Sequence, residues 1–492
     1  MTFTSFAFLV FLPAVVAAYY LCTPRLRWAV LLLASCYFYM AFVPQYILVL
    51  FFLIGVDFLI AERIEASAGA RRRVWLITGI ILTVGVLFVF KYFNFFNANI
   101  AALARLLDWN YSIEALRLLL PLGLSFHVFQ SLSYLIEVYR ATYPAQRHLG
   151  FYALYVMFFP QLVAGPIERP AHLLPQLKRS APFSTANLES GLRLMAWGFF
   201  KKLVIADQLA VSVDYIYGNA GALTGPSVTV GMVFFALQLY ADFSGYTDIA
   251  RGSARMLGIE LVHNFKQPYF SRSIAEFWRR WHISLSSWFR DYFYYPLIYT
   301  AKRATRGWLY ACIVITFVVT GLWHGAGWTF MLMGAIFGFY IVLGLVTRGW
   351  REALARHSGL ARYPSIRAIL QTVITFILVC VAWVFFRSPD LKSALLFLGR
   401  VPHGWNLTPG QYLDAYVMQP FWALGIGRNV LMVSVFFVIL LLLVEYREQR
   451  GPIGVLLDRQ PILVRSFLYS SLLLAIVLFG SFASPLFIYF QF

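Results

Sequence analysis

Long apolar runs alternate with short polar segments, many of them rich in arginine, over most of the 492-residue chain. A helix that spans a bilayer needs about 20 mostly apolar residues, with roughly 17–25 allowed. Several of the apolar runs are short or contain polar residues, so the twelve spans that we predict are a working count. They lie at residues 3–21, 28–43, 46–60, 74–90, 118–138, 190–217, 226–244, 308–323, 328–346, 366–386, 429–445 and 466–490. The pattern predicts an all-α polytopic membrane protein.

The composition supports this class, because 61% of the residues are hydrophobic and only 12% are charged, against about 25% charged in soluble domains. The four cysteines are dispersed without a CxxC pair, so they predict neither a disulfide framework nor a thiolate metal site. The N-terminal apolar run has no basic stretch before it, which favours a first span over a cleaved signal peptide.

The formal net charge of +19 could indicate nucleic acid binding, but the distribution of the charge argues against it. Most of the 40 lysines and arginines fall in one set of alternate loops, such as residues 71–73 and 251–306. Basic loops mark the cytoplasmic side of a membrane protein. We therefore expect both termini on the periplasmic side, no nucleic acid partner, and a cytoplasmic surface that attracts anionic lipid headgroups or an anionic donor.

Residues 151–175 begin like a membrane helix but contain Pro160, Gly165, Pro166 and Pro170. Proline removes a backbone donor and ends or kinks a helix. Irregular backbone at membrane depth survives only where protein buries it or where it lines a cavity. We interpret the segment as re-entrant, with an interfacial loop as the alternative.

A helix start is predicted at Ser273, because Ser273 and Glu276 have the spacing of a capping box. After it, aromatic and apolar side chains recur at helical spacing and form one face, while Arg279 lies on the other side. The members of this face are Trp278, Trp281, His282, Leu285, Trp288, Phe289 and Tyr292. His282 is expected to point into the protein; a membrane-surface helix with a satisfied histidine is the alternative.

Asp242, Ser244, Thr247 and Asp248 fall at the end of a predicted span. Ionisable side chains at membrane depth are costly and indicate a functional site. The alternative is that Asp242 caps a helix or pairs with an arginine. Ser244 is not surrounded by G-x-S-x-G, so a serine nucleophile is not predicted.

His324 stands in the segment GLWHG, between two apolar runs that form a helical hairpin. Close packing at the GxxxG spacing, with a hydrogen-bonded histidine, is one explanation. The other is chemical. His324 lies 16 residues after Trp308, roughly 24 Å along a helix, which is short of an apolar core of about 30 Å. An imidazole there suits a base that activates a hydroxyl toward an acyl thioester. A metal site at His282 and His324 lacks a third ligand, so no metal is expected.

Five segments together resemble the membrane-bound O-acyltransferase (MBOAT) family. They read FWRRWHISLSSWFRDYFYYPL, GLWHGAGW, FFPQLVAGPIERP, YADFSGYTDIARG and PLGLSFHVFQSLSYLIEVYR. The resemblance covers roughly residues 1–390 and is to the bacterial branch that includes alginate, peptidoglycan and cellulose O-acetylation proteins. It implies one integral-membrane domain, residues 1–492, with N-terminal helices (1–110), a core that carries the motifs (115–390), and an outer loop with two C-terminal spans (391–492).

The resemblance further implies a helical bundle with re-entrant helices and a central tunnel, with His324 and His282 as the catalytic histidines. The substrate or tunnel candidates are Trp323, Asp242, Ser244, Trp278, Trp281 and Arg279. No bound cofactor is expected. The donor would be a cytoplasmic thioester, acetyl-CoA or an acyl carrier protein, and the acceptor an extracytoplasmic, alginate-like polysaccharide. The location would be the bacterial inner membrane, with a periplasmic Ser-His-Asp (SGNH-type) acetyltransferase as partner.

Two alternatives stay open: D-alanyl transfer to teichoic acid, and a polysaccharide exporter or transporter without acyl transfer. The absence of a visible internal repeat weighs against the transporter. Two positions also depart from the family pattern. His127 stands where relatives have another aromatic residue, either as neutral packing or as a polar group in a channel. Residues 298–307, IYTAKRATRG, replace a glycine-rich turn.

Overall fold

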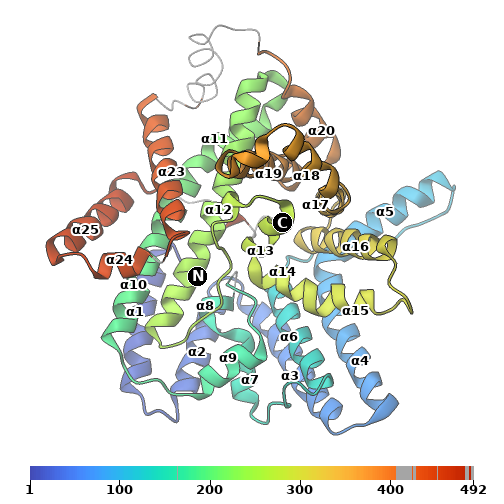
Figure 1. The fold of residues 1–492 in the computed structure, drawn as a ribbon. Helices are drawn as coiled ribbons and strands as arrows, with labels where there is room; N and C mark the ends of the chain where they lie inside the picture. The colour runs from blue at the N-terminus through green and yellow to red at the C-terminus, as the bar shows by residue number, and fades with distance from the viewer. Residues whose placement is uncertain (163–164, 406–423, 425–427, 452, 483–486, 489–492) are drawn as a thin grey trace. The chain divides into compact units, whose positions relative to one another are not determined.

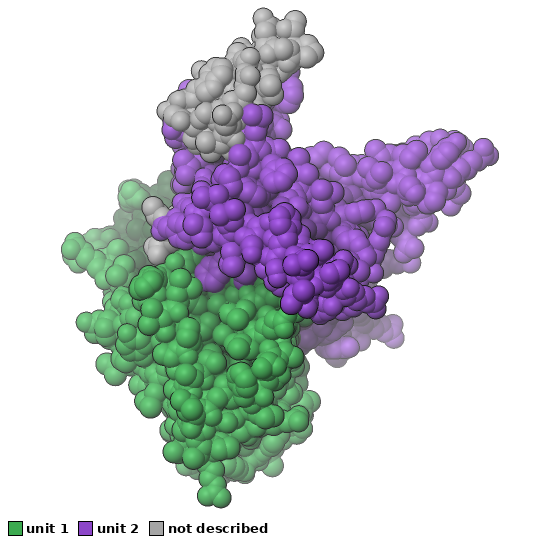
Figure 2. Space-filling model, turned by 90° about the vertical axis from the view of Figure 1, so that its left-hand side faces the viewer, with its two compact units in different colours: residues 1–195, 247–263 green, residues 196–246, 264–492 purple. Residues whose placement is uncertain are grey.

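The computed structural model describes residues 1–162, 165–405, 424, 428–451, 453–482 and 487–488. In these residues the regular structure is helical, without a β-strand. Figure 1 shows these helices along the chain, and the chain forms two compact units, which Figure 2 colours separately. Unit 1 comprises residues 1–195 and 247–263, and unit 2 comprises residues 196–246 and 264–492. The two predicted catalytic histidines and the substrate or tunnel candidates all lie in unit 2, whereas Thr247 and Asp248 lie in unit 1.

Unit 1 consists of the N-terminal helices and the end of one long helix. The helices are α1 (Phe6–Leu21), α2 (Arg27–Met40), α3 (Ile47–Glu65), α4 (Gly69–Leu87), a π-helical stretch (Phe88–Tyr92), α5 (Phe93–Leu106), α6 (Leu124–Tyr139), α7 (Leu149–Met157), α8 (Phe159–Leu162), α9 (Pro170–Lys178) and most of α10 (Thr185–Phe199). The last turns of α12 (Gly225–Met256) complete it.

Unit 2 holds the motif-bearing helices and the C-terminal part of the chain. After a π-helix (Phe200–Ala206) come α11 (Asp207–Gly218), the first part of α12, α13 (Ile274–Arg280), α14 (Ile283–Phe289), a second π-helix (Arg290–Tyr294), α15 (Tyr295–Ile298), α16 (Arg306–His324), α17 (Trp328–Val346), α18 (Arg348–His357), α19 (Pro364–Arg387), α20 (Leu391–Arg400), α23 (Arg428–Glu448), α24 (Ile453–Asp458) and α25 (Ile462–Phe479).

Each predicted apolar segment contains a helix, and six helices in the described part of the chain are long and apolar enough to cross a membrane. Several boundaries were wrong. The segment predicted at 118–138 is helical only from Leu124, and the one predicted at 226–244 continues as a helix to Met256. The helix that begins at Gly69 does not stop near residue 90 but runs to Leu106, a total of 38 residues. The final helix ends at Phe479 rather than at residue 490, and residues 483–486 and 489–490 of that prediction lie outside the described residues.

The proline-interrupted segment is a broken helix inside unit 1. Helix α7 ends at Met157, Phe158 leaves the helical conformation, and α8 resumes for four residues. Residues 152–162 are all buried. The backbone N–H of Phe159 is bound by the hydroxyl of Ser35 at 3.0 Å, so a side chain from α2 accepts a hydrogen bond at the break. The stretch is buried in unit 1, as irregular backbone at membrane depth would have to be, and its re-entrant position in the membrane stays a prediction.

An aromatic core holds α13 in unit 2. Phe277 lies 5.4 Å from Trp281 and 6.2 Å from Phe337 of α17, measured between ring centroids. Trp383 of α19 contacts both Trp281, at 5.3 Å, and Phe337, at 5.3 Å. Large aromatic side chains bury 150–250 Å² each, so they dominate the packing energy of such a core. The core fixes the segment that carries His282 against α17 and α19.

The outer segment predicted at residues 387–428 is described only in part. Its first residues form α20, and the guanidinium of Arg387 lies 2.6 Å from a carboxylate oxygen of Asp214. Tyr217 stacks on Phe397 of α20 at 4.2 Å. The ion pair thus fixes the end of α19 to α11, and the ring contact fixes α20 to α11. Residues 406–423 and 425–427 lie outside the described part, so the prediction of a surface location is not tested there.

Candidate active site

Glycine residues allow α16 and α17 to pack closely in their hairpin. A Cβ on Gly321 would lie 2.1 Å from the carbonyl oxygen of Phe330, and one on Gly334 would lie 2.1 Å from that of Phe317. These distances are far below van der Waals contact, so only glycine allows the two backbones to approach this closely. The packing explanation for the GxxxG spacing is thus correct for the glycines. It leaves the role of the histidine open.

His324 is the last residue of α16 and is 4% exposed. Its ring lies 4.9 Å from that of Trp323 and 5.6 Å from that of Phe386, which belongs to α19. The turn that follows, Gly325 to Gly327, leads directly into α17. The predicted hairpin with a histidine at its end is therefore confirmed. His324 is held in an aromatic environment made by α16 and α19.

His282 interrupts the helix that the sequence predicted to continue. Helix α13 ends at Arg280, Trp281 is extended, and His282 adopts the left-handed conformation with φ 43° and ψ 55° before α14 begins. Ser273 does cap α13, because its hydroxyl accepts a hydrogen bond from the backbone N–H of Glu276 at 3.2 Å. The prediction of the helix start was right, and that of one unbroken helix was wrong. The helical periodicity of aromatic and apolar side chains contains no signal for one residue in the left-handed conformation.

The break directs the His282 imidazole into the protein, where it is fully buried. Its ring lies 4.7 Å from Phe243 of α12 and 6.1 Å from Trp323 of α16. His282 stands between α13 and α14, outside the candidate spanning helices. Burial, and secondarily the His324 imidazole, lower the pKa of His282 well below its ordinary value, so its ring is neutral near pH 7.

Trp323 links the two histidines, since its ring contacts both imidazoles. The other aromatic candidates serve as the wall behind them. Trp278 lies 5.2 Å from Phe317 and 5.0 Å from Phe337, and Trp281 packs on Trp383. The whole predicted aromatic face is buried, which excludes the alternative of a helix on the membrane surface. Arg279, in contrast, is exposed on the opposite side of α13 and is not brought to the histidines.

Asp242 belongs to a buried ion cluster in unit 2. The ammonium nitrogen of Lys202 lies 2.8 Å from a carboxylate oxygen of Asp242 and 2.8 Å from one of Asp207. These three side chains are 2–4% exposed, and Asp242 also accepts a hydrogen bond from the backbone N–H of Ile488 at 2.9 Å. Asp242 thus pairs with a lysine, where the sequence suggested a cap or an arginine. A buried charge requires such a partner.

Asp242 of the ion cluster precedes Phe243 in α12, and the Phe243 ring contacts His282. The ion cluster therefore helps to fix the turn of α12 that packs against His282. Lys202 and Asp207 were missed by the sequence analysis. The signal that could have found Lys202 was its position inside an apolar span, where an ionisable side chain needs a partner. Lys202 also lies in a π-helix, a local widening that recurs at functional sites.

The polar residues Ser244, Thr247 and Asp248 lie well inside α12, which continues to Met256, and not at the end of a span as predicted. Ser244 is 2% exposed, and its hydroxyl has no hydrogen bond to a described residue. Next to it, a Cβ on Gly245 would lie 2.8 Å from the carbonyl oxygen of Gly198, so α12 and α10 approach closely there. No hydrogen bond joins the Ser244 hydroxyl to either histidine in the described part of the chain.

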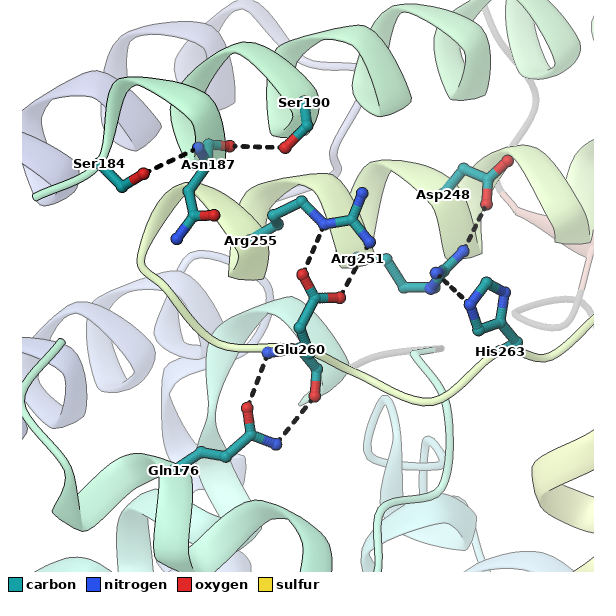
Figure 3. A network of polar contacts seen from close by, with 9 residues as sticks. All are labelled: Gln176, Ser184, Asn187, Ser190, Asp248, Arg251, Arg255, Glu260 and His263. Atoms are coloured by element: carbon teal, nitrogen blue, oxygen red, sulfur yellow. Dashed lines mark hydrogen bonds and ion pairs between the residues drawn. The ribbon is translucent and has the colours of Figure 1, made fainter. Parts of the chain in front are cut away.

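A separate polar network lies in unit 1, around the segment that follows α12 (Figure 3). The side-chain amide of Gln176 binds the backbone of Glu260 twice, donating to its carbonyl at 3.0 Å and accepting from its N–H at 2.9 Å. Arg255 donates two hydrogen bonds to the Glu260 carboxylate, at 2.6 and 2.9 Å. Glu168 accepts from the backbone N–H of Val262 at 2.7 Å. The network fixes residues 260–262 to α9.

Two histidines of this network differ in their protonation. His172 is hydrogen-bonded to Glu168 at 2.6 Å, and this bond raises the pKa of His172. His263 is bound at Nε2 by Arg251 at 2.9 Å (Figure 3); burial, and then the Arg251 charge, lower its pKa to about 4. Since arginine only donates, the Nε2 atom of His263 accepts and carries no proton.

His127 lies in α6 of unit 1 and is 1% exposed. Its ring is 6.5 Å from that of Tyr39, and a Cβ on Gly123 would lie 3.3 Å from its Nε2 atom. Packing beside Tyr39 supports the first of the two interpretations of His127. Within the described residues no three His, Cys, Asp or Glu side chains form a group that could hold a metal ion.

The site therefore consists of two buried imidazoles that share a tryptophan, a wall of aromatic rings, and an ion cluster behind Phe243. The chemistry available to it is proton transfer by an imidazole in a water-poor environment. Its setting is a helical polytopic membrane protein.

Comparison with known proteins identifies the family within this class of membrane proteins. Residues 147–385 match the model of the membrane-bound O-acyltransferase family, MBOAT. The chain is similar to the probable alginate O-acetylase of Pseudomonas aeruginosa, with 38% identity over 401 residues, 80% of this chain and 73% of that protein. It is also similar to the peptidoglycan O-acetyltransferase of Helicobacter pylori, with 35% identity over 395 residues, 75% of this chain and 72% of that protein.

A more distant similarity is to the teichoic acid D-alanyltransferase of Bacillus subtilis, with 28% identity over 279 residues, 54% of this chain and 68% of that protein. The chain belongs to the membrane-bound O-acyltransferase family, and it is an O-acyltransferase. The resemblance seen in the sequence motifs is thus confirmed.

Proposed function

We propose that this protein transfers an acetyl group from a cytoplasmic thioester across the inner membrane for O-acetylation of an extracytoplasmic polysaccharide. The observation that carries the proposal is the pair of buried imidazoles, His282 and His324, on either side of Trp323. The similarity to an alginate O-acetylase supports an alginate-like acceptor, and the similarity to a peptidoglycan O-acetyltransferase supports acetyl as the group transferred.

In this mechanism His324 is the general base. A nitrogen of its imidazole takes the proton of the acceptor hydroxyl as the hydroxyl oxygen attacks the thioester carbonyl carbon. The carbon–sulfur bond then breaks, the acetyl group remains on oxygen as an ester, and the thiolate leaves with the proton that the imidazole returns. His282 orients the reacting groups. The aromatic wall limits water, which would otherwise hydrolyse the thioester.

The distribution of basic residues supports the direction of transfer. With the basic loops in the cytoplasm and both termini in the periplasm, the donor, acetyl-CoA or an acyl carrier protein, would approach a positively charged surface. The histidines would lie along a central tunnel toward the periplasm. The hydroxyl that is acetylated at His324 would then be the intermediate acceptor, from which a periplasmic Ser-His-Asp acetyltransferase passes the acetyl group to the polymer.

The test is polymer acetylation in cells whose only copy of this protein carries His324→Ala. Ester-linked acetate on the extracellular polysaccharide is measured against the wild type, and the amount of protein in the membrane is measured by immunoblot. We expect acetylation to be lost at an unchanged protein level. Normal acetylation in this strain would end the proposal.

A second assay identifies the donor and the group transferred. Membranes receive radiolabelled acetyl-CoA, an acetylated acyl carrier protein or a D-alanylated carrier protein, and label is followed into the polymer. We expect label from an acetyl donor only. Label from the D-alanyl carrier alone would replace acetyl transfer by D-alanyl transfer and leave the role of His324 intact.

A further inference from the structure

The His282 side chain does not cap the helix that begins after it. Helix α14 begins at Ile283, so His282 is its N-cap residue. The first N–H groups of a helix have no partner inside the helix, and the N-cap side chain normally accepts from the second or third of them. The His282 imidazole makes no such capping hydrogen bond. It points to Phe243 and Trp323 instead.

Asn264, on the segment after α12, does the capping in its place. Its backbone carbonyl accepts from the N–H of Ile283 at 2.9 Å. Its side-chain oxygen accepts from the N–H of Ser284 at 3.2 Å and from the Ser284 hydroxyl at 2.6 Å. Because the Ser284 backbone N–H can only donate, it also determines which atom of the Asn264 amide is the oxygen. The first two N–H groups of α14 are therefore satisfied from a distant segment.

The segment around Asn264 contacts the chain both before and after His282. The N–H of Lys266 donates to the carbonyl of Arg280 at 2.9 Å, just before the break. The ring of Phe265 lies 5.1 Å from Trp281 and 5.0 Å from Phe243. Asn264 itself is 1% exposed. These contacts stabilise the left-handed backbone conformation of His282, which is unfavourable for any residue other than glycine.

We infer that Asn264 is a positioning residue for His282: by capping α14 from outside, it holds the left-handed backbone that directs the imidazole toward Phe243 and Trp323. The inference rests on the proposed function only for its effect on the rate. Its structural half is independent, because the orientation of the ring can be observed directly.

The kinetic test is a double-mutant cycle on acetyl transfer by the purified full-length protein in lipid vesicles. Asn264→Ala removes the side-chain acceptor, and we expect the maximal rate to fall about tenfold or more, since small misplacements of a reacting group are costly. In a His282→Ala background the same change should have less than about a twofold effect, because residues that act through one another are not additive. A similar loss in both backgrounds would overturn the inference.

Two variants distinguish capping from general destabilisation. Asn264→Asp keeps an acceptor oxygen toward Ser284 and should restore most of the rate that Asn264→Ala loses. Asn219→Ala, at an exposed asparagine of unit 2 that binds only the carbonyl of Tyr215 among the contacts described, should leave the rate unchanged. Failure of Asn264→Asp to recover more activity than Asn264→Ala would contradict the capping role.

The second readout needs no catalysis. The protein has eight histidines, and labelling them with ¹³C and ¹⁵N gives imidazole resonances among which that of His282 is identified by its loss in His282→Ala. We expect this resonance to shift or broaden in Asn264→Ala and to return in Asn264→Asp. An unchanged resonance overturns the positioning role even if transfer occurs. A shifted resonance in a protein without transferase activity would support the positioning role and reject the proposed function.

Discussion

The ring centroids of His282 and Trp323 lie 6.1 Å apart, so the break between α13 and α14 meets the last turn of α16. The same tryptophan contacts His324, its neighbour in the chain, at 4.9 Å. Trp323 is 5% exposed and has little freedom to move. It therefore couples the positions of two side chains that reach the site from different helices.

This coupling predicts a kinetic phenotype for Trp323. Trp323→Ala removes the surface between the two imidazoles, and we expect the maximal rate of acyl transfer to fall about 10- to 100-fold, because their alignment relaxes. Trp323→Phe keeps an aromatic surface and should lose less. Trp350→Ala, at a tryptophan of unit 2 that is 67% exposed, is the matched control. Equal rates for Trp323→Ala and the wild type would exclude the coupling.

The ion cluster predicts a stability phenotype. Lys202→Met leaves Asp207 and Asp242 buried without their cation, and we expect a loss of about 3–5 kcal/mol in the free energy of unfolding. Unfolding in detergent, followed by circular dichroism, measures it. Adding Asp242→Asn removes one of the two unpaired charges and should recover part of the loss. A Lys202→Met protein as stable as the wild type would show that the cluster is not a net stabilising contact.

The glycine contact of the hairpin predicts a steric phenotype. Gly334→Ala places a methyl group 2.1 Å from the carbonyl oxygen of Phe317, and the backbone must separate to relieve the clash. We expect a cost of about 1–3 kcal/mol and lower activity, since His324 ends α16, the helix that carries Phe317. In Gly349→Ala the new methyl group has no atom within 4 Å, so this variant should behave like the wild type. Comparable stability and activity in both variants would contradict the close approach.

The hydrogen bond from His172 to Glu168 predicts a pH dependence. Because it raises the pKa of His172, the folded state binds this proton more tightly than the unfolded chain does. The contribution of the pair to the free energy of unfolding is thus complete below pH 6.5 and is lost as the pH rises through the raised pKa. We expect His172→Gln to be destabilised relative to the wild type at low pH, with the difference shrinking as the pH rises above 6.5 and through the raised pKa of His172.

His263 provides the control of opposite sign. Its pKa is lowered to about 4, so the unfolded chain binds the proton more tightly and stability is lost as the pH falls from 6.5 toward 4. His263→Gln keeps an acceptor for Arg251 without titrating, and should lose less stability than the wild type over that range. The measurement is the thermal unfolding midpoint of each variant across its pH range. The account would be contradicted if His172→Gln and His263→Gln changed the pH dependence of this midpoint in the same direction.

Much of the fold follows from local sequence signals. Hydrophobic run length located the helices, and Ser273 marked the start of α13, because both signals act within a few residues. The predicted span stopped near residue 90, although the helix continues past Asn94 and Asn97 to Leu106. The side chains of Asn94 and Asn97 bind the backbone carbonyls of Leu116 and Ile113, at 2.8 and 3.1 Å. These tertiary contacts are not visible in the local sequence.

The residues of the candidate site could be proposed from the sequence, but their geometry could not. The motifs singled out His282 and His324 as candidates, and the aromatic spacing correctly predicted that His282 faces inward. The left-handed turn at His282 depends on Asn264, and the fate of Asp242 depends on Lys202. Neither partner is close in sequence, so periodicity and motif spacing carry no information about them.

The central claim is that the imidazole of His324 takes the proton of the acceptor hydroxyl. The most direct measurement is the single-turnover rate of acetyl transfer from a labelled thioester by purified protein in lipid vesicles, for the wild type and for His324→Ala with an equal unfolding midpoint. General bases contribute about 10²- to 10⁴-fold, so we expect a loss of that size. A folded His324→Ala protein that transfers acetyl at the wild-type rate would contradict the account.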